Sequence, residues 1–359
     1  MTNLYKTLSI NNRKIGLNHP TYFIAEIGSN FDGDLNRAKD LIYLAKENGA
    51  EAAKFQHYTA EHLVSDYGFK SLSVINSHQS NWHSSVFDTY KKASLNKDWT
   101  EELSQTCKQV GIEFMTSPYS LDLIEYVNKY VNSFKVGSGE ITWLEAIRLM
   151  ASKNKPILLA TGASNEKEVI KAVKTIKEFT TKIVLMQCNT NYTGAKDNFK
   201  YQNLNVLKRY IELFPEIILG ISDHTSGFVS VLGSIALGAR VVEKHFTDNK
   251  SRIGPDHSFA MDVKDWKDMI SYTRDLEASL GSKIKQIESN EKETVILQRR
   301  SIRAKLPLKS GTKVKREDVV FLRPCPIEAL DPSSFDEIKG KRLVHDISEG
   351  DIIRNIDLT

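Results

Sequence analysis

The 359-residue sequence has only three cysteines, Cys107, Cys188 and Cys325, and none of them belongs to a Cys-x-x-Cys pair. An odd number of widely spaced cysteines excludes a small scaffold stapled by disulfides, and it provides no cysteine motif for a metal. The sequence therefore favours a protein of the reducing cytoplasm.

Strong charge imbalance and long apolar runs are also missing. The 49 Lys and Arg residues nearly balance the 45 Asp and Glu residues, which gives a net charge of +4. So small a charge favours neither nucleic acid nor an anionic membrane surface as a partner. Residues 1–20 contain no apolar signal core, and no run reaches the roughly 18 apolar residues that a membrane-spanning helix needs. We therefore expect a cytoplasmic protein without a membrane partner.

Eight short apolar segments, each followed by a stretch of helical periodicity, occupy the first four fifths of the sequence. These segments are Tyr22–Glu26, Ala52–Gln56, Glu113–Thr116, Ser133–Lys135, Ile157–Thr161, Ile183–Cys188, Ile217–Ser222 and Val241–His245. Eight β/α units in series predict an α/β fold, the (β/α)8 TIM barrel, whose catalytic groups gather where the strands end. Because most of the segments end in polar residues, the pattern indicates an enzyme.

The last sixty residues differ from the barrel pattern. A polar stretch follows Leu280, and short β-like runs with several prolines follow it. The pattern predicts a barrel domain over residues 1–285, a linker over 286–298 and a small β-rich domain over 299–359. The expected core of this small domain consists of Ile302, Leu306, Val314, Val319, Leu343, Ile347 and Ile352.

Two histidines stand at the ends of the last two predicted strands, His224 and His245. Side chains alternate along a strand, so Glu243 and His245 share one face while Lys244 takes the other. The two imidazoles can then meet and hold a divalent ion, with Asp223 or Glu243 orienting the rings. A structural role for each histidine is the alternative.

A second group combines two cations with two hydroxyls, namely Lys54, Lys135, Ser117 and Ser138. Such a group suits a phosphate, and the glycines that flank Ser138 allow backbone N–H groups to approach an anion. The alternatives are a tight turn around Ser138 and lysines in solvent at the rim. Since Lys54 lies within an apolar strand segment, we expect its side chain to point into the barrel mouth.

Two carboxylates complete the candidate site. Glu26 ends the first predicted strand and can accept a proton or bind a sugar hydroxyl, although pairing with a nearby lysine is the structural alternative. Asp256 lies in the loop after the eighth predicted strand, where barrel loops line active sites.

Six motifs, taken in order, resemble the bacterial sialic acid (N-acetylneuraminate) synthase family. They are Ile24-Ala25-Glu26-Ile27-Gly28, Lys54-Phe55-Gln56, Lys135-Val136-Gly137-Ser138-Gly139-Glu140, Ser222-Asp223-His224-Thr225, Glu243-Lys244-His245-Phe246-Thr247 and Gly254-Pro255-Asp256. The segment from Arg299 to the end resembles the antifreeze-like (SAF) domain of that family. The resemblance implies condensation of phosphoenolpyruvate with an N-acylated hexosamine such as N-acetylmannosamine, which gives a nine-carbon 2-keto acid and phosphate. Legionaminic or pseudaminic acid synthases, which act on 2,4-diacetamido sugars, are open alternatives.

The resemblance also assigns residues. It implies a divalent ion, Mn²⁺ or Mg²⁺, held by His224 and His245, and a domain-swapped homodimer in which Arg300 of one chain reaches the sugar in its partner. The catalytic group is Glu26, Gln56, His224 and His245. The implied phosphoenolpyruvate contacts are Lys54, Asn81, Ser117, Lys135, Ser138, Thr190 and Tyr192, and the implied sugar contacts are Glu140, Asp256 and Arg300. Ala160 replaces a serine of many family members, so Thr161 is a substitute candidate for a phosphate contact.

Other functions are weaker matches to the sequence. Condensing enzymes of the octulosonate-phosphate or heptulosonate-phosphate type need a second basic cluster for a sugar phosphate, and the sequence offers none. A Schiff-base aldolase would need Lys135 or Lys54 with a lowered pKa and no metal. A non-enzymatic scaffold that binds ice or carbohydrate leaves the polar strand ends unexplained.

Overall fold

The computed structural model describes residues 7–72, 79, 82 and 84–359. The chain divides into two compact units, Met1–Gly281 and Ser282–Thr359. Within the described ranges, no helix is both long enough and apolar enough to cross a membrane. The first unit carries most of the polar strand ends identified in the sequence.

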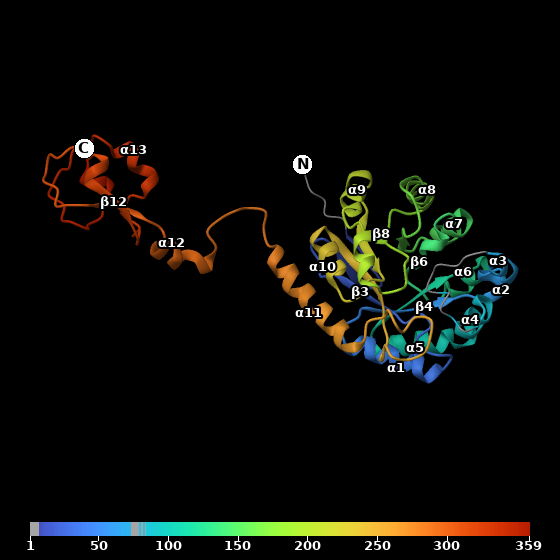
Figure 1. Cartoon of the computed structure of the whole chain (residues 1–359). Coiled ribbons are helices and arrows are strands. Elements are labelled where there is room, and N and C mark those ends of the chain that lie inside the picture. Colours follow the sequence, from blue (N-terminus) through green and yellow to red (C-terminus); the bar gives the residue numbers. More distant parts are fainter. Residues whose placement is uncertain (1–6, 73–78, 80–81, 83) are drawn as a thin grey trace. The chain divides into compact units, whose positions relative to one another are not determined.

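A parallel sheet of eight strands forms the centre of the first unit, with helices around it (Figure 1). The strands follow each other in space as β5-β4-β3-β10-β9-β8-β7-β6, and every predicted segment agrees with its strand to within two residues at either end. The predicted (β/α)8 barrel is therefore confirmed. The strands are β3 (Tyr22–Glu26), β4 (Ala52–His57), β5 (Glu113–Pro118), β6 (Phe134–Val136), β7 (Ile157–Ala160), β8 (Ile183–Cys188), β9 (Ile218–Asp223) and β10 (Ala239–His245).

The register of the strands aligns polar residues at their carboxyl ends. Glu26 on β3 is paired with His245 on β10 on one side and with Lys54 on β4 on the other. Gln56 on β4 is in turn paired with Ser117 on β5. Because parallel strands all end at the same rim, this register brings residues that are far apart in the sequence to one edge of the barrel.

The helices pack apolar faces against the outside of the sheet. In α8, for example, the buried residues Val169, Ala172, Val173 and Ile176 recur at helical spacing, and Asn165 begins the helix with a capping box. The helices of the first unit are α1 (Leu35–Glu47), α2 (Ala60–Leu63), α3 (Asp66–Ser71), α4 (Val86–Ala93), α5 (Thr100–Val110), α6 (Leu121–Val127), α7 (Leu144–Ser152), α8 (Glu166–Lys177), α9 (Val206–Leu213), α10 (Val229–Ala236) and α11 (Val263–Leu280).

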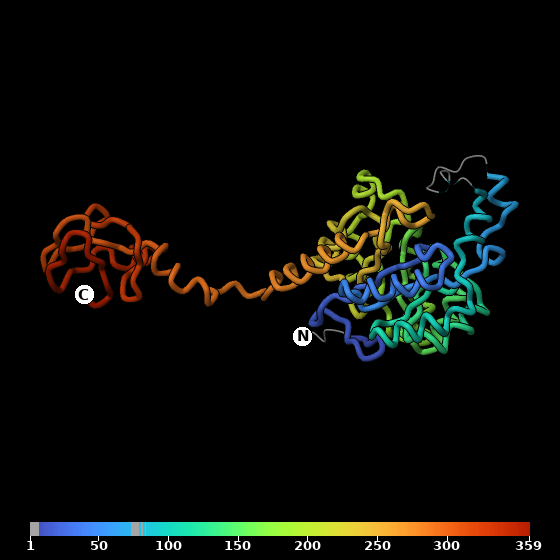
Figure 2. The backbone as a smooth tube through the Cα atoms, turned by 90° about the horizontal axis from the view of Figure 1, so that it is seen from below, coloured from blue at the N-terminus to red at the C-terminus, as the bar shows by residue number. Residues whose placement is uncertain are grey.

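An antiparallel hairpin of β1 (Thr7–Ile10) and β2 (Arg13–Gly16) precedes the barrel and is dark blue in Figure 2. Its residues Leu8, Ile10 and Ile15 are buried in one cluster with inward-facing strand residues such as Tyr22 and Met115. This cluster closes the barrel interior at the end opposite the polar rim. Because this end is filled by apolar side chains, the polar side chains of the barrel lie at the opposite rim.

The second unit has its own core. It contains α12 (Lys292–Gln298), the antiparallel strands β11 (Ser301–Ala304) and β12 (Val319–Leu322), and α13 (Phe335–Ile338). Two of the seven expected core residues were wrong, since Leu306 is 59% exposed and Ile352 is only half-buried. Leu308 and Ile353 take those places, because the chain turns between short strands and the inward position shifts.

Candidate active site

A cavity of about 230 Å³ opens at the carboxyl-terminal rim of the barrel. Eleven of the fourteen residues that the sequence identified line this single cavity. They are Glu26, Lys54, Gln56, Ser117, Lys135, Ser138, Glu140, Tyr192, His224, His245 and Asp256. We call this cavity the catalytic pocket.

Four charged side chains form a buried network on one wall of the catalytic pocket. The Lys54 Nζ is paired with Glu26 and lies 3.6 Å from Glu243 Oε1, and the Lys135 Nζ lies 3.4 Å from the same oxygen. Ser117 Oγ lies 3.4 Å from Lys54 Nζ. Each of the four charged side chains is no more than 7% exposed, so both lysines point into the barrel as expected for Lys54.

The two carboxylates of this network differ in acidity. Burial raises the pKa of Glu26, and the charge of Glu243 adds to the rise, although Lys54 opposes it. For Glu243, burial also favours the neutral acid, but Lys135 and Lys54 outweigh it and lower the pKa. Two neighbouring carboxyls with pKa values pushed apart are typical of acid–base sites. Glu243 is thus the fixed charge, and Glu26 is the group able to exchange a proton.

The two imidazoles meet as the sequence predicted. The ring centroids of His224 and His245 lie 5.5 Å apart, and the ring of Tyr192 packs 4.2 Å from that of His224. Burial lowers the pKa of both histidines, so both are neutral. The Nδ1 of His224 lies 2.9 Å from the carbonyl oxygen of Asn189, which makes Nδ1 the donor and leaves the lone pair on Nε2.

These donors suit a loosely held divalent ion. Neutral imidazole is a common metal ligand, and the buried Nδ1 of His245 has no hydrogen-bond partner within the described part of the chain. Among the described residues, no group of three or more His, Cys, Asp or Glu side chains forms a complete metal site. An ion at the two histidines would therefore take its other ligands from substrate and water.

The expected orienting role of Asp223 was wrong. Its carboxylate accepts hydrogen bonds from Lys244 Nζ at 2.6 Å and from the Thr225 hydroxyl at 2.8 Å. Asp223 follows the inward-facing Ser222, so alternation turns its side chain to the outer face of the strand. The carbonyl of Asn189, and not this carboxylate, bonds His224.

Asp256 reaches the catalytic pocket from the loop after β10. Its Oδ2 accepts hydrogen bonds from the Ser29 backbone N–H at 3.0 Å and hydroxyl at 2.7 Å, and lies 3.8 Å from His245 Nδ1. Gly28, at φ +54°, lets the chain turn beneath it. A Cβ on Gly28 would lie 2.7 Å from Asp256 Oδ2 and 3.4 Å from both Glu26 Oε1 and His245 Cε1. Asp256, Glu26 and His245 can approach each other in this way only because Gly28 has no side chain.

Three candidates remain. Thr190 lines a neighbouring groove, Arg300 is an exposed residue of the second unit that donates to the Phe321 carbonyl, and Asn81 lies outside the described residues. Thr161, the substitute candidate for a phosphate contact, also faces away from the catalytic pocket. Its hydroxyl donates to the Met186 carbonyl at 3.0 Å and accepts from the Tyr210 hydroxyl at 3.0 Å. Leu158 on β7 faces the barrel interior, so alternation along the strand turns Thr161 outwards.

Sequence reasoning assigned only part of the aromatic wall of the catalytic pocket, since the aromatic segment 71–94 with Trp82 was expected to shape the sugar pocket. Tyr58, Tyr90 and Tyr119 line it together with Trp82, and the ring of Tyr58 packs against the rings of Tyr90 and Tyr119 at 5.6 and 6.0 Å. Tyr58 and Tyr119 each come directly after the end of a strand, and this position could have indicated that they lie at the rim. Tyr90 lies on α4, within the segment 71–94 that was expected to shape the sugar pocket, although the sequence did not single it out.

Comparison with known proteins agrees with this geometry. Residues 41–285 match the NeuB family, and residues 299–359 match the SAF domain. The chain is 34% identical to the N,N'-diacetyllegionaminic acid synthase of Legionella pneumophila, with 94% of this chain and 96% of that protein covered. It is 29% identical to the human N-acetylneuraminate-9-phosphate synthase, with coverage of 95% and 93%. The crystal structure of spore coat polysaccharide biosynthesis protein SpsE from Bacillus subtilis matches with a TM-score of 0.65 over 99% of each chain, at 28% identity. From its barrel to its SAF domain, the chain belongs to the NeuB family.

Proposed function

We propose that this protein condenses phosphoenolpyruvate with an N-acylated hexosamine to give a nine-carbon 2-keto acid and phosphate. The observation that carries the proposal is the buried network of Lys54, Lys135, Glu26 and Glu243 beside two neutral histidines in one pocket. Cations for an anionic substrate and donors for an aldehyde-binding ion thus lie side by side. The family membership of the chain supports the same reaction.

Phosphoenolpyruvate is the anionic substrate of the proposal. Lys54 and Lys135 would bind its negative groups, with the hydroxyls of Ser117 and Ser138 as further donors. With Glu26 protonated, the two lysines and Glu243 leave one net positive charge. The raised pKa of Glu26 therefore favours an anion in this pocket.

The open-chain sugar would lie on the side of His224, His245 and Asp256. A divalent ion, Mn²⁺ or Mg²⁺, when bound by the two imidazoles, would polarise the aldehyde oxygen. C3 of phosphoenolpyruvate forms the new bond to the aldehyde carbon, water adds at C2, and phosphate leaves with cleavage of its C–O bond. Glu26, held by Gln56 Nε2 at 2.7 Å, would transfer a proton in this sequence.

A Schiff-base aldolase is a poorer fit to the same pocket. Burial alone would lower the pKa of Lys54, but the charges of Glu243 and Glu26 outweigh it and raise the pKa. A lysine that forms a Schiff base must lose its proton readily. Lys54 is therefore proposed as an ionic contact and not as a nucleophile.

The sugar itself has two candidates. N-acetylmannosamine fits the proposed reaction, and a 2,4-diacetamido sugar is the alternative because the relative from L. pneumophila is named a diacetyllegionaminic acid synthase. The aromatic wall of Tyr58, Tyr90 and Tyr119 would accommodate the less polar face of either sugar. We also propose a cytoplasmic location and a homodimer in which Arg300 of one chain completes the partner's site.

The decisive experiment measures release of phosphate from phosphoenolpyruvate. The purified chain, supplied with Mn²⁺ or Mg²⁺, is incubated with N-acetylmannosamine, with 2,4-diacetamido sugars and without sugar. Release that requires one of the sugars, together with a nine-carbon keto acid detected by mass spectrometry, supports the proposal. Phosphate release without sugar, or none with any sugar, contradicts it.

A further inference from the structure

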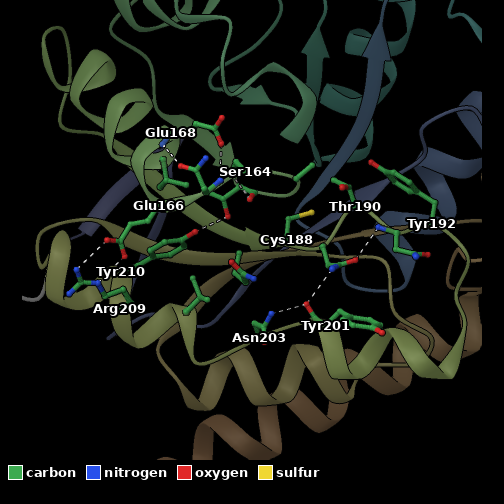
Figure 3. A pocket seen from close by; sticks show the side chains of 18 of the residues that line it. Ser164, Glu166, Glu168, Cys188, Thr190, Tyr192, Tyr201, Asn203, Arg209 and Tyr210 are labelled. Atoms are coloured by element: carbon green, nitrogen blue, oxygen red, sulfur yellow. Dashed lines mark hydrogen bonds and ion pairs between the residues drawn. The ribbon is translucent and has the colours of Figure 1, made fainter. Parts of the chain in front are cut away.

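A second cavity lies beside the catalytic pocket, between the loops that follow β7 and β8 (Figure 3). Its volume is about 1000 Å³, at the upper end of the range for small-molecule sites. Figure 3 shows Glu166, Arg209 and Tyr210 at one end and Thr190 and Tyr192 at the other. We call this cavity the β7–β8 groove. The proposed condensation gives it no role.

The charges of the β7–β8 groove do not suit an anion. Its charged lining residues are Glu166, Glu168 and Arg209. Arg209 donates to Glu166 at 2.9 and 3.2 Å and to Glu212 at 3.0 Å, so this cation is already neutralised. A phosphate or a keto acid would meet a net negative wall.

Neutral polar groups dominate the rest of the lining. Amide side chains and hydroxyls each offer donors and acceptors, which is the combination that sugar hydroxyls require. Examples are Asn189, Asn191, Asn203, Ser164, Thr193 and Tyr201. The side chain of Tyr201 is 57% exposed and offers a flat ring to the apolar face of a sugar.

The backbone around the groove is left-handed at two points, of which the alanine is the strained one. Ala163 has φ +48° and Asn203 has φ +46°, and both residues line the groove. Left-handed backbone is uncommon for residues other than glycine, particularly for alanine, and such strain concentrates at functional sites.

One residue joins the β7–β8 groove to the candidate metal ligand. The carbonyl oxygen of Asn189 accepts from His224 Nδ1, while its side-chain amide donates to the Tyr201 carbonyl at 3.2 Å across the groove. Tyr192 lines both the groove and the catalytic pocket. A ligand in the groove would therefore contact groups that hold His224 in place.

From these observations, we propose that the β7–β8 groove binds a neutral sugar, separately from the acceptor in the catalytic pocket. Neutral polar groups, an exposed aromatic ring and the lack of a free cation among the described residues of the lining select this class over anionic ligands. The sugar comes either from a free monosaccharide or from the end of a glycan chain, because both present the same hydroxyls and N-acyl groups.

The test is isothermal titration calorimetry of the full chain with N-acetylmannosamine, di-N-acetylchitobiose and the anionic N-acetylneuraminic acid. Hydrogen exchange locates each ligand through protection of residues 199–206. Tyr201→Ala should weaken neutral-sugar binding roughly tenfold, the equivalent of losing one buried aromatic face. Tyr201→Phe should retain it. Tyr43→Ala, which removes another exposed tyrosine far from the groove residues, is the matched control. Tyr201→Leu replaces Tyr201→Ala if the latter does not fold.

Each outcome decides the proposal. Tighter binding of the disaccharide identifies a glycan end, and equal binding identifies a free monosaccharide. Sugar-dependent protection of residues 199–206 that Tyr201→Ala leaves unchanged, or Tyr201-dependent binding that prefers the anionic sugar, overturns the proposal. Tyr201-dependent binding without any phosphate release would support sugar binding in the groove and contradict the proposed condensation. Condensation without Tyr201-dependent binding would support the condensation and contradict sugar binding in the groove.

Discussion

The Nε2 of His257 lies 2.8 Å from Oδ1 of Asp32, and this contact ties the loop after β10 to the loop after β3. His257 is fully buried, and its Nδ1 lies 2.8 Å from the Thr247 hydroxyl. Asp256 is the next residue, so the contact fixes the carboxylate that approaches His245. The same aspartate Asp32 also pairs with Arg252 and Arg37.

Replacing His257 should therefore loosen Asp256 without touching the substrate. We expect His257→Asn to cost about 1–3 kcal/mol of stability and to raise the KM of the sugar roughly fivefold, because one buried hydrogen bond is lost. The KM of phosphoenolpyruvate should stay within about twofold. Steady-state kinetics checks both values, with His19→Asn as the control. An equal rise in both KM values would mean that the whole rim has moved.

Glu26→Gln tests proton transfer. The amide keeps the size of the side chain and the contact to Gln56 but cannot exchange a proton, so kcat should fall about 10²–10⁴-fold with little change in KM. The matched variant is Glu243→Gln, which removes the fixed charge between the two lysines. This control should alter binding of phosphoenolpyruvate instead. Normal turnover of Glu26→Gln would remove it from the proposed chemistry.

The two-histidine site predicts weak metal retention. Dialysis against a chelator should abolish activity, and added Mn²⁺ should restore it in the wild type but not in His224→Ala or His245→Ala. Each substitution removes one of two protein ligands. Bound metal is measured by mass spectrometry of the dialysed protein, with His19→Ala as the control. Full activity of metal-free protein would disprove the assignment.

The proposed homodimer predicts complementation between inactive chains. Mixed Arg300→Ala and Glu26→Gln chains should recover part of the wild-type activity, because one site of each heterodimer would receive both intact residues. Native mass spectrometry verifies that the subunits exchange. Exchange without recovery would show that Arg300 acts within its own chain or has no catalytic role.

The buried His57 should make the free energy of unfolding depend on pH in acid. Burial lowers the pKa of His57 from 6.5 to about 4, and its ring nitrogens contact the Thr116 and Thr100 hydroxyls. A lowered pKa means that the unfolded chain binds the proton more readily, so stability is full above pH 6.5 and falls as the pH drops towards 4. The loss amounts to about 3 kcal/mol. Denaturant unfolding at several pH values should show a shallower fall for His57→Gln, and identical curves would contradict the assignment.

Sequence patterns identified the strands and most of the rim because each strand carries its own signal. Lys54 and His245 are recognised by polarity at the end of an apolar run, and alternation places Glu243 beside them. Alternation, applied to Ser222, would also have turned Asp223 outwards. The same rule, applied to the inward-facing Leu158, would have turned Thr161 outwards.

Contacts between distant segments were beyond such patterns. Asp32 and His257 are separated by 225 residues, and nothing in either local sequence indicates the other. The hairpin residues Leu8 and Ile15 also lie in a segment too polar to suggest that it closes a barrel. In the small domain, Leu306 and Leu308 are two residues apart in a turn, so periodicity could not select the buried one.

Gly28 gives the site a limit set by bulk and backbone conformation, without any charge. A single methyl group at this position would press on one side chain from each of three segments, Asp256, Glu26 and His245, while leaving every charge and every titratable group unchanged. Most substitutions in a charged pocket change its shape and its electrostatics together. A methyl group at Gly28 would change the shape of the pocket without changing its charges. For anyone wishing to redesign the acceptor specificity of this enzyme family, Gly28 is a fixed point around which the other walls have to be varied.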